Sequence, residues 1–529
     1  MKKIIKYFSF LLIVLSILTI KVNATSKSIN VNLDTLEYSL NKSNYTNISV
    51  YSSQEEFLKD YMSNSLPDIY ITNFLFDGVS SVQTPDLDDF IENDSNDTKI
   101  KTLEIKVINI NTTGDIELSG SIKGAMIGIN TNNKIGNINI ILNNVNIDTD
   151  TKKAPAIYVY NKDKNYTDCI VTIKTLSETK NYIKGGKLKK VSLIGSDELD
   201  KYSNYYFNDT LTNYNKYPSY YGIYTSDEIK NILFATVKAD SEDLADGDPY
   251  YFYKCSGAIS SDIDLYFDGE GYLKVTGTDE GIETKGNLTF SGGTGDYEIY
   301  AEDDALNTTT ANSNEQTVRN DLIIDVNSLL AVVSTDADEG DAIDSNGKLI
   351  INGGTIYAFA HPTSQDAGLD SVNGIYLNGG EIIATGNMVD AISSDSQQKY
   401  IYANFNKISS DTLIVIKNQN GEVITAFKTG RNIGNLLYSS KNLEYESYKI
   451  YTGGIIDGEE INGLYTKINS YSGGEEITFN EASGMRLREN NNLSSVLLKS
   501  LLIESGLLIV IISYYCISSY NKKKKIINK

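Results

Sequence analysis

The feature that most constrains this fold is an internal repeat in the second half of the chain. A small residue followed by Ile or Leu recurs with steps of 23, 24, 37, 26 and 23 residues. A unit of this length cannot bury its apolar side alone, so we expect successive units to stack and share one core. The six doublets are Ala258-Ile259, Gly281-Ile282, Ala305-Leu306, Ala342-Ile343, Gly368-Leu369 and Ala391-Ile392.

The second half of each unit repeats as well. The stretches "GNLTFSGG", "GKLIINGG" and "NGIYLNGG" alternate apolar and polar residues and end in a glycine pair. Alternation is typical of strands, and glycine tolerates the positive φ that a tight corner needs. The unit is shorter than a propeller blade and lacks the LxxLxL spacing of leucine-rich repeats. The sequence therefore predicts an all-β fold, a parallel β-helix.

Both ends of the chain predict targeting segments. Three lysines at positions 2, 3 and 6 precede an apolar run over 8–20 that ends in "VNA", which predicts a cleaved signal peptide at 1–24, with a signal anchor as the alternative. Residues 500–520 are hydrophobic with Glu504 as the only charge, and Lys522 to Lys525 follow. This predicts a C-terminal transmembrane helix with a cytoplasmic tail at 521–529, with a buried helix as the alternative. The expected location is the cell membrane, single-pass, with the bulk of the chain extracellular.

The rest of the chain divides into three parts, one of which contains an insertion. We expect an N-terminal lead-in or cap at 25–105, with one short helix after Ser53 and a strand over 68–76. The β-helix follows at 106–475, with an irregular insertion at 176–250, and a linker occupies 476–499. Residues 226–233 predict a short helix within the insertion.

Charge and composition exclude several functions. The net charge is −22, which argues against nucleic acid or anionic lipid as a partner and favours divalent cations. One histidine, His361, and three scattered cysteines disfavour a zinc site and any Ser-His-Asp or Cys-His catalytic arrangement. A phosphate-cradling GxxxxGK[ST] loop is also absent from the sequence.

Acidic residues flank the repeated doublets. If the units stack, carboxylates of adjacent units approach to roughly 5 Å and repel by about 3 kcal/mol per pair. Calcium removes this conflict, because it binds six to eight oxygens and spans about the same distance. The alternative is that these residues are exposed turn formers. They are Asp279, Glu280, Asp303, Asp304, Asp341, Asp344, Asp366, Asp370, Asp390 and Asp395.

Several stretches resemble a known bacterial family. "SGAISSDIDLYFDGEGYLKVTGTDEGIETKGNLTFSGG" and "GDAIDSNGKLIINGGTIYAFA" resemble exported carbohydrate-binding domain-containing proteins, and the similarity covers roughly 105–475. The resemblance implies a right-handed parallel β-helix similar to polysaccharide lyases, with bound calcium. It also implies binding to cellulose-like or acidic pectin-type polysaccharide without demonstrated cleavage. The implied calcium ligands are Asp303, Asp304, Asp341, Asp344, Asp366, Asp370 and Asp390.

Three functions stay open at this point. The leading prediction is a calcium-binding cell-surface protein that binds polysaccharide, with Tyr357, Phe359 and Tyr376 as candidate sugar-stacking rings. A calcium-dependent pectate-type lyase is the first alternative, and it would need a basic residue such as Lys285 or Lys348. The third is a structural adhesin or spacer. Whether the protein is an enzyme stays open, with binding alone favoured.

Overall fold

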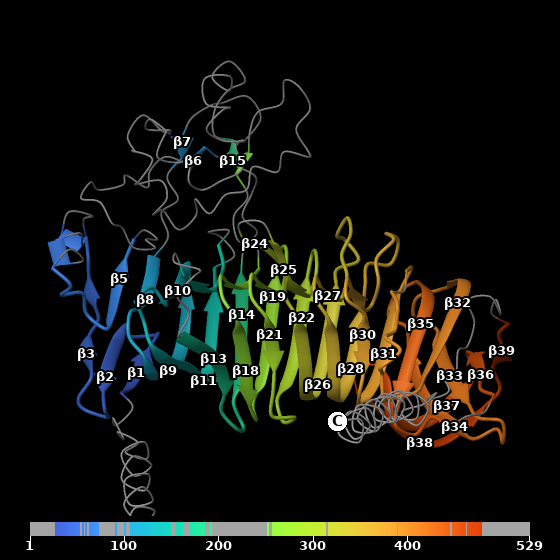
Figure 1. The fold of residues 1–529 in the computed structure, drawn as a ribbon. Helices are drawn as coiled ribbons and strands as arrows, with labels where there is room; N and C mark the ends of the chain where they lie inside the picture. Colours follow the sequence, from blue (N-terminus) through green and yellow to red (C-terminus); the bar gives the residue numbers. More distant parts are fainter. Residues whose placement is uncertain are drawn as a thin grey trace, which may run out of the picture.

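The structure is a computed structural model composed mainly of β-strands (Figure 1). Residues 56–57 and 59–60 are helical, within the helix expected after Ser53. The structure describes residues 27–52, 56–57, 59–60, 63–73, 90–91, 100–101, 106–149, 154–161, 169–185, 191–192, 251–252, 257–313 and 316–478, apart from 389, 445–446 and 462. The predicted signal peptide, the helix expected at 226–233 and most of the predicted 476–499 linker lie outside these residues.

One sheet of ten short strands runs along the molecule in the order β29-β27-β23-β20-β17-β12-β10-β8-β5-β4. All neighbouring strands from β8 to β29 pair in parallel, whereas β5 pairs antiparallel with β8. The strands are β4 (Ser49–Val50), β5 (Ile69–Thr72), β8 (Lys106–Ile110), β10 (Ala125–Asn130), β12 (Ile157–Tyr160), β17 (Ile259–Ser261), β20 (Ile282–Thr284), β23 (Leu306–Thr308), β27 (Ile343–Ser345) and β29 (Asp370–Ser371).

This sheet confirms the register of the sequence repeat. Ile259, Ile282, Leu306 and Ile343 are successive register partners, each at the second place of its doublet. On the main sheet, Leu288, Leu322, Leu349 and Ile375 form another row, and Ile299, Ala331, Ala358 and Ala384 a third. The long step of the repeat contains β26, as its alternation predicts. Burying one aliphatic residue per unit at each place produces a continuous core.

The main sheet corrects the predicted fold class. Its strand pairings close on themselves as a barrel, so the prediction of a right-handed parallel β-helix is wrong. Closure arises because β11, β26 and β28 each pair with two different strands along their length. β26, for example, pairs with β21 at its start and with β22 after a register shift at Asp325. The alternation in the sequence predicts strands but not that three of them each continue from one partner strand to the next.

Seventeen strands form this closed sheet. They are β1 (Ser28–Asn32), β2 (Glu37–Leu40), β3 (Thr46–Asn47), β9 (Gly114–Lys123), β11 (Gly136–Asp148), β13 (Cys169–Thr175), β14 (Lys180–Gly185), β18 (Leu265–Gly269), β19 (Tyr272–Gly277), β21 (Leu288–Phe290), β22 (Asp296–Ala301), β26 (Leu322–Val333), β28 (Leu349–Phe359), β30 (Ile375–Leu377), β31 (Glu381–Gly386), β32 (Tyr400–Ile408) and β35 (Ile433–Ser440).

Glycines occupy the corner positions of the repeat, within β28 at Gly354 and between β30 and β31 at Gly380. Gly354 has φ +110°, and a Cβ there would lie 2.7 Å from a side-chain methyl of Val326. Gly380 has φ +92° and lies against the carbonyl oxygen of Gly354 in the previous unit. The corners therefore need glycine both for its backbone conformation and for its lack of a side chain.

The two ends of the stack differ from its middle. At the N-terminal end, β1 of the predicted lead-in pairs in parallel with β9. Inside the stack, β14 lies within the predicted insertion but pairs regularly with β11 and β19. At the other end, β35 pairs antiparallel with β31 and β32, and a six-stranded sheet follows. Its strands are β33 (Leu413–Lys417), β34 (Val423–Lys428), β36 (Lys449–Thr452), β37 (Ile455–Ile461), β38 (Leu464–Ser472) and β39 (Glu475–Glu476).

The remaining strands among the described residues form three two-stranded sheets. They pair β6 (Phe90–Ile91) with β7 (Ile100–Lys101), β15 (Val191–Ser192) with β16 (Tyr251–Phe252), and β24 (Thr310–Ser313) with β25 (Gln316–Arg319).

The prediction of a C-terminal transmembrane helix, and with it of a single-pass membrane location, is also corrected. Among the residues that the structure describes, no helix has the length and apolar character needed to cross a membrane. The segment expected to do so, 500–520, lies outside the described residues.

Candidate functional site

Acidic and amide side chains form a row across the ten-stranded sheet. Register pairing aligns one residue each from β20, β23, β27 and β29, which are Glu283, Asn307, Asp344 and Asp370. A second row lies just before the doublets, where the carbonyl oxygens of Glu280, Asp304 and Asp341 each accept a backbone hydrogen bond from the preceding unit. The repeat therefore makes neighbours of acidic and amide residues that lie 24 to 37 residues apart in sequence.

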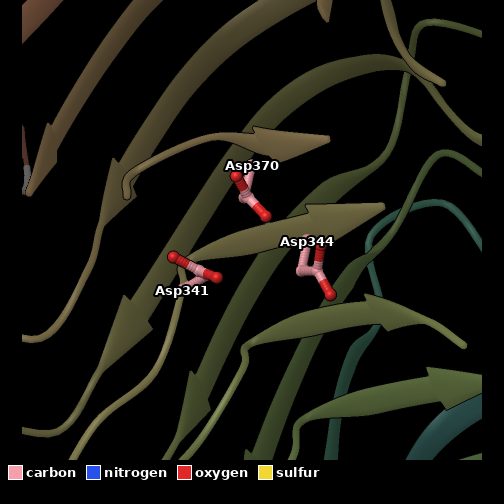
Figure 2. A group of neighbouring side chains, drawn as sticks. All are labelled: Asp341, Asp344 and Asp370. Atoms are coloured by element: carbon pink, nitrogen blue, oxygen red, sulfur yellow. The ribbon is translucent and has the colours of Figure 1, made fainter. Parts of the chain in front are cut away.

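Three of these carboxylates form a compact cluster, which we call the Asp341 cluster: Asp341, Asp344 and Asp370. One oxygen from each lies within 4.8 Å of the other two. Figure 2 shows Asp344 and Asp370 on the neighbouring strands β27 and β29, with Asp341 on the turn that leads into β27. Carboxylate oxygens at this spacing are the ligands that calcium prefers.

Other predicted ligands tie the units together through backbone N–H groups. Asp304 Oδ1 accepts the N–H of Asp341 at 2.7 Å, and Asp366 Oδ2 accepts the N–H of Gly340 at 2.7 Å and the hydroxyl of Ser364. Asp390 Oδ2 similarly accepts the N–H of Ser371 at 3.0 Å, whereas Asp303 is half-buried beside Asp304. In the structure Asp366 and Asp390 thus use an oxygen to hold the turns around the cluster.

Burial and mutual repulsion strain the cluster when it is fully charged. Burial raises the pKa of Asp341 to about 8; the N–H of Ala367, which donates to Asp341 Oδ1 at 2.5 Å, opposes this rise, and nearby carboxylates add to it. Burial also raises the pKa of Asp344 to about 7, and the nearby charge of Asp370 contributes to the same rise. The pKa of Asp370 is raised by its burial and by Asp390. A bound divalent cation would favour the ionised forms of all three.

The two lysines considered for lyase chemistry have other contacts. Lys285 Nζ lies 3.0 Å from Asp262 Oδ1, and the Asp262 side chain is almost fully buried. Lys348 is exposed, and its Nζ lies 5.5 Å from the centre of the Tyr376 ring. Lys285 Nζ thus donates to Asp262, and the backbone N–H of Lys348 donates to Asp321 Oδ1 at 2.8 Å.

Two of the three predicted sugar-stacking rings lie inside the protein. Tyr357 and Phe359 point away from the main core, as their alternation predicts, but they are only 6% and 8% exposed. They pack with residues of the C-terminal strands, and the Arg431 guanidinium lies 5.7 Å from the Phe359 ring centre. Tyr376 is half-buried beside Lys348. In this structure, only Tyr376 of the three could present a ring to a ligand.

A different aromatic group lies on the outer face of β14, β19 and β22. The tyrosine surface comprises Tyr182, Tyr272, Lys274, Glu298 and Tyr300, which occupy outward positions of these strands. The Tyr182 and Tyr272 rings pack edge to face with their centres 6.1 Å apart, and Lys274 Nζ lies 4.3 Å from the Tyr300 ring centre. Lys274 Nζ also lies 3.8 Å from Glu298 Oε2.

Sequence reasoning missed most of this surface. Tyr182 falls in the stretch predicted to be an irregular insertion, so its place on a regular strand was not expected. The motifs "YIKG", "YLKVTG" and "EIYA" do carry a signal, because tyrosine and charged residues alternate there with buried residues.

Part of the chain matches a known protein family. Residues 223–315 match the model of a family described as "Carbohydrate-binding domain-containing protein". The described part of this range includes β17 to β24, and hence Tyr272, Lys274 and Tyr300 of the tyrosine surface together with Glu280 and Asp304. A comparison with curated proteins found no match, and a comparison with solved structures found none either.

Proposed function

We propose that this protein binds polysaccharide of the cellulose-like or acidic pectin type without cleaving it, and that it holds calcium in the Asp341 cluster. One observation carries the proposal. The carbohydrate-binding family match covers β19 and β22, the two strands that contribute four of the five residues of the tyrosine surface.

The tyrosine surface suits a sugar chain by its chemistry. A tyrosine ring presents a flat apolar face and a polar hydroxyl, and a pyranose ring likewise has apolar C–H faces and a polar rim. Tyr182 is 43% exposed, and Tyr272 and Tyr300 are half-buried, so their positions are fixed by packing while part of each ring stays accessible. Lys274 and Glu298 offer hydrogen bonds of both kinds and nearly cancel in charge. The surface is therefore compatible with neutral and acidic glycans alike.

Calcium has a structural role in this proposal. The cluster's three carboxylates come from adjacent repeat units, and their repulsion opposes the stacking of those units. An ion that all three bind would convert this repulsion into a link between β27 and β29. The ion would stabilise the stack, and the sugar would bind elsewhere, on the tyrosine surface.

A pull-down on insoluble polysaccharides tests the sugar surface. We expect the double variant Tyr182→Ala/Tyr272→Ala to lose roughly tenfold or more in retention on cellulose or cross-linked pectin, because it removes two of the three rings of the surface, which contact each other. Tyr45→Ala is the matched control, since Tyr45 is also exposed, at 49%, but lies in the N-terminal region outside the tyrosine surface. Equal retention of the double variant and the control would contradict the assignment.

The same preparation distinguishes the other two functions. Incubation with polygalacturonate and calcium should produce no unsaturated product absorbing in the ultraviolet. Such product would replace the non-cleaving proposal with a lyase. Retention of the wild-type chain on none of the polysaccharides would favour a structural spacer.

A further inference from the structure

One lysine of the six-stranded sheet at the C-terminal end of the molecule differs from the other lysines of that sheet (Figure 1). The strands of this sheet carry four lysines, and the fourth is Lys417 on β33. Among the residues that the structure describes, Lys417 has no carboxylate at ion-pair distance. The other three each pair with a glutamate: Lys428 Nζ with Glu460 Oε2 at 2.6 Å, Lys449 Nζ with Glu476 Oε2 at 2.9 Å and Lys467 Nζ with Glu459 Oε1 at 3.2 Å.

Two tyrosine rings hold Lys417 instead. Its Nζ lies 4.8 Å from the ring centre of Tyr451 and 4.7 Å from that of Tyr471. At these distances a ring face attracts a cation. The rings are fixed in turn, because the Tyr451 hydroxyl donates to Glu476 Oε2 at 3.1 Å and the Tyr471 hydroxyl donates to the carbonyl oxygen of Gly453 at 2.9 Å. The ammonium group of Lys417 therefore has a defined place on the sheet.

The three side chains lie on the face of the sheet that is turned away from the closed barrel. Ile414 of β33 packs in the core between this sheet and the barrel, whereas Val415 packs with Tyr451 and Tyr471 on the opposite face. Lys417 lies two residues after Val415 on the same strand and so shares its face. Lys417 and both tyrosines are half-buried, so part of each side chain stays accessible.

We propose that Lys417, Tyr451 and Tyr471 form a second sugar-binding site, which binds a uronate residue of an acidic polysaccharide by its carboxylate. An ammonium group without a paired acid is the complement of a single negative charge, and it keeps its N–H donors for a carboxylate. The two tyrosines offer ring surface to the apolar C–H groups of the sugar. This inference rests on the proposed function in its class of ligand, but it uses a different surface and selects acidic over neutral glycans.

The charges around the site favour a uronate over a phosphate-bearing ligand. A carboxylate carries one negative charge, whereas a phosphate monoester carries about two near neutral pH. Lys417 supplies one positive charge, and the Glu476 carboxylate beside Tyr451 opposes a second negative charge on the ligand. The site therefore matches a single anionic group attached to a ring with apolar faces.

Calorimetric titration of the full-length chain with oligogalacturonate tests the site. The double variant Tyr182→Ala/Tyr272→Ala serves as the background, because it removes two rings of the tyrosine surface. Oligogalacturonate should still bind in this background, and adding Lys417→Gln should weaken that binding by about tenfold or more. In the otherwise wild-type chain, Lys417→Gln should change the affinity for a cello-oligosaccharide of the same length by less than about twofold, because that sugar has no carboxylate.

Two variants control for charge and for folding. Lys467→Gln removes a lysine from the same sheet, but one that pairs with Glu459 and lies outside the site, so the affinity for oligogalacturonate should stay within about twofold of its starting value. Lys417→Arg should retain most of the affinity, because it keeps a cation between the rings. Thermal unfolding of Lys417→Gln and Lys467→Gln should give similar melting temperatures, since neither lysine belongs to a buried ion pair.

The outcomes separate this site from the tyrosine surface. Equal binding of oligogalacturonate by Lys417→Gln and Lys467→Gln would refute the second site, as would equal weakening of both sugars by Lys417→Gln. Retention of the double variant on polysaccharide then decides the tyrosine surface independently. If the wild type binds no oligogalacturonate, the second site is refuted, and retention on cellulose still tests the tyrosine surface.

Discussion

Removal of calcium should make the stability of this protein fall as pH rises from 5 to 8. The reason lies in the raised pKa values of the Asp341 cluster. In the unfolded chain Asp341 ionises near its ordinary value of 3.8, whereas in the folded chain its burial raises the pKa to about 8. The folded state therefore keeps a proton that the unfolded state has already lost. The stability this proton contributes is complete below pH 3.8 and is lost as pH rises through about 8.

The magnitude follows from the difference between the two pKa values. At 1.36 kcal/mol per pKa unit, Asp341 alone changes the free energy of unfolding by roughly 6 kcal/mol between these limits. Asp344, with a pKa of about 7, acts in the same direction. For a chain of this size the sum corresponds to a fall in melting temperature of at least about 5 °C between pH 5 and pH 8. Calcium should reverse the trend, because it binds the ionised carboxylates and binds them better as pH rises.

Thermal unfolding followed by circular dichroism at pH 5, 6.5 and 8, in chelator and in calcium, measures both effects. Asp341→Asn should raise the melting temperature in chelator at pH 8, change it little at pH 5, and reduce the stabilisation by calcium. Asp395→Asn is the control, since Asp395 is exposed and lies outside the cluster. A melting temperature in chelator that stays level or rises between pH 5 and 8 would refute the reasoning.

Two further predictions concern the scaffold. Gly354→Ala should destabilise the protein by about 2 kcal/mol or more in denaturant unfolding, because φ is +110° and the new Cβ would meet Val326. Gly421→Ala is the control and should destabilise less, because φ is +83° there but no atom lies near its Cβ. Equal losses of stability in the two variants would contradict the packing argument. Lys285→Met should destabilise the folded protein by about 3 kcal/mol, because it leaves the buried Asp262 carboxylate without its ion-pair partner. Adding Asp262→Asn should recover part of that stability, and a double variant with no recovery would contradict this cause.

The sequence predicts the local pattern of this protein better than its closure. Inward positions such as Leu349 and Ala358 are recognisable because apolar residues alternate and recur with the repeat. The closed barrel is not recognisable, because it depends on β26 and β28 each continuing past a register shift from one partner strand to the next, and this continuation leaves no periodic signal. The burial of Tyr357 depends in turn on strands that lie much later in the chain. Alternation predicts which side of a strand a residue occupies but not what covers that side.

The metal and sugar proposals concern different sheets, and the chain connects them at the corners. The strands β19 and β22 carry Lys274 and Tyr300, and each strand is followed within a few residues by an acid of the row predicted to bind calcium, Glu280 or Asp304. The backbone N–H groups of residues 302 and 303 both donate to the carbonyl oxygen of Asp279, so the two corners are already joined. An ion held there would restrain the ends of the strands that carry the tyrosine surface without touching the sugar. Calcium would then affect sugar binding by restraining the motion of these strands, because the rings themselves lie on the closed sheet.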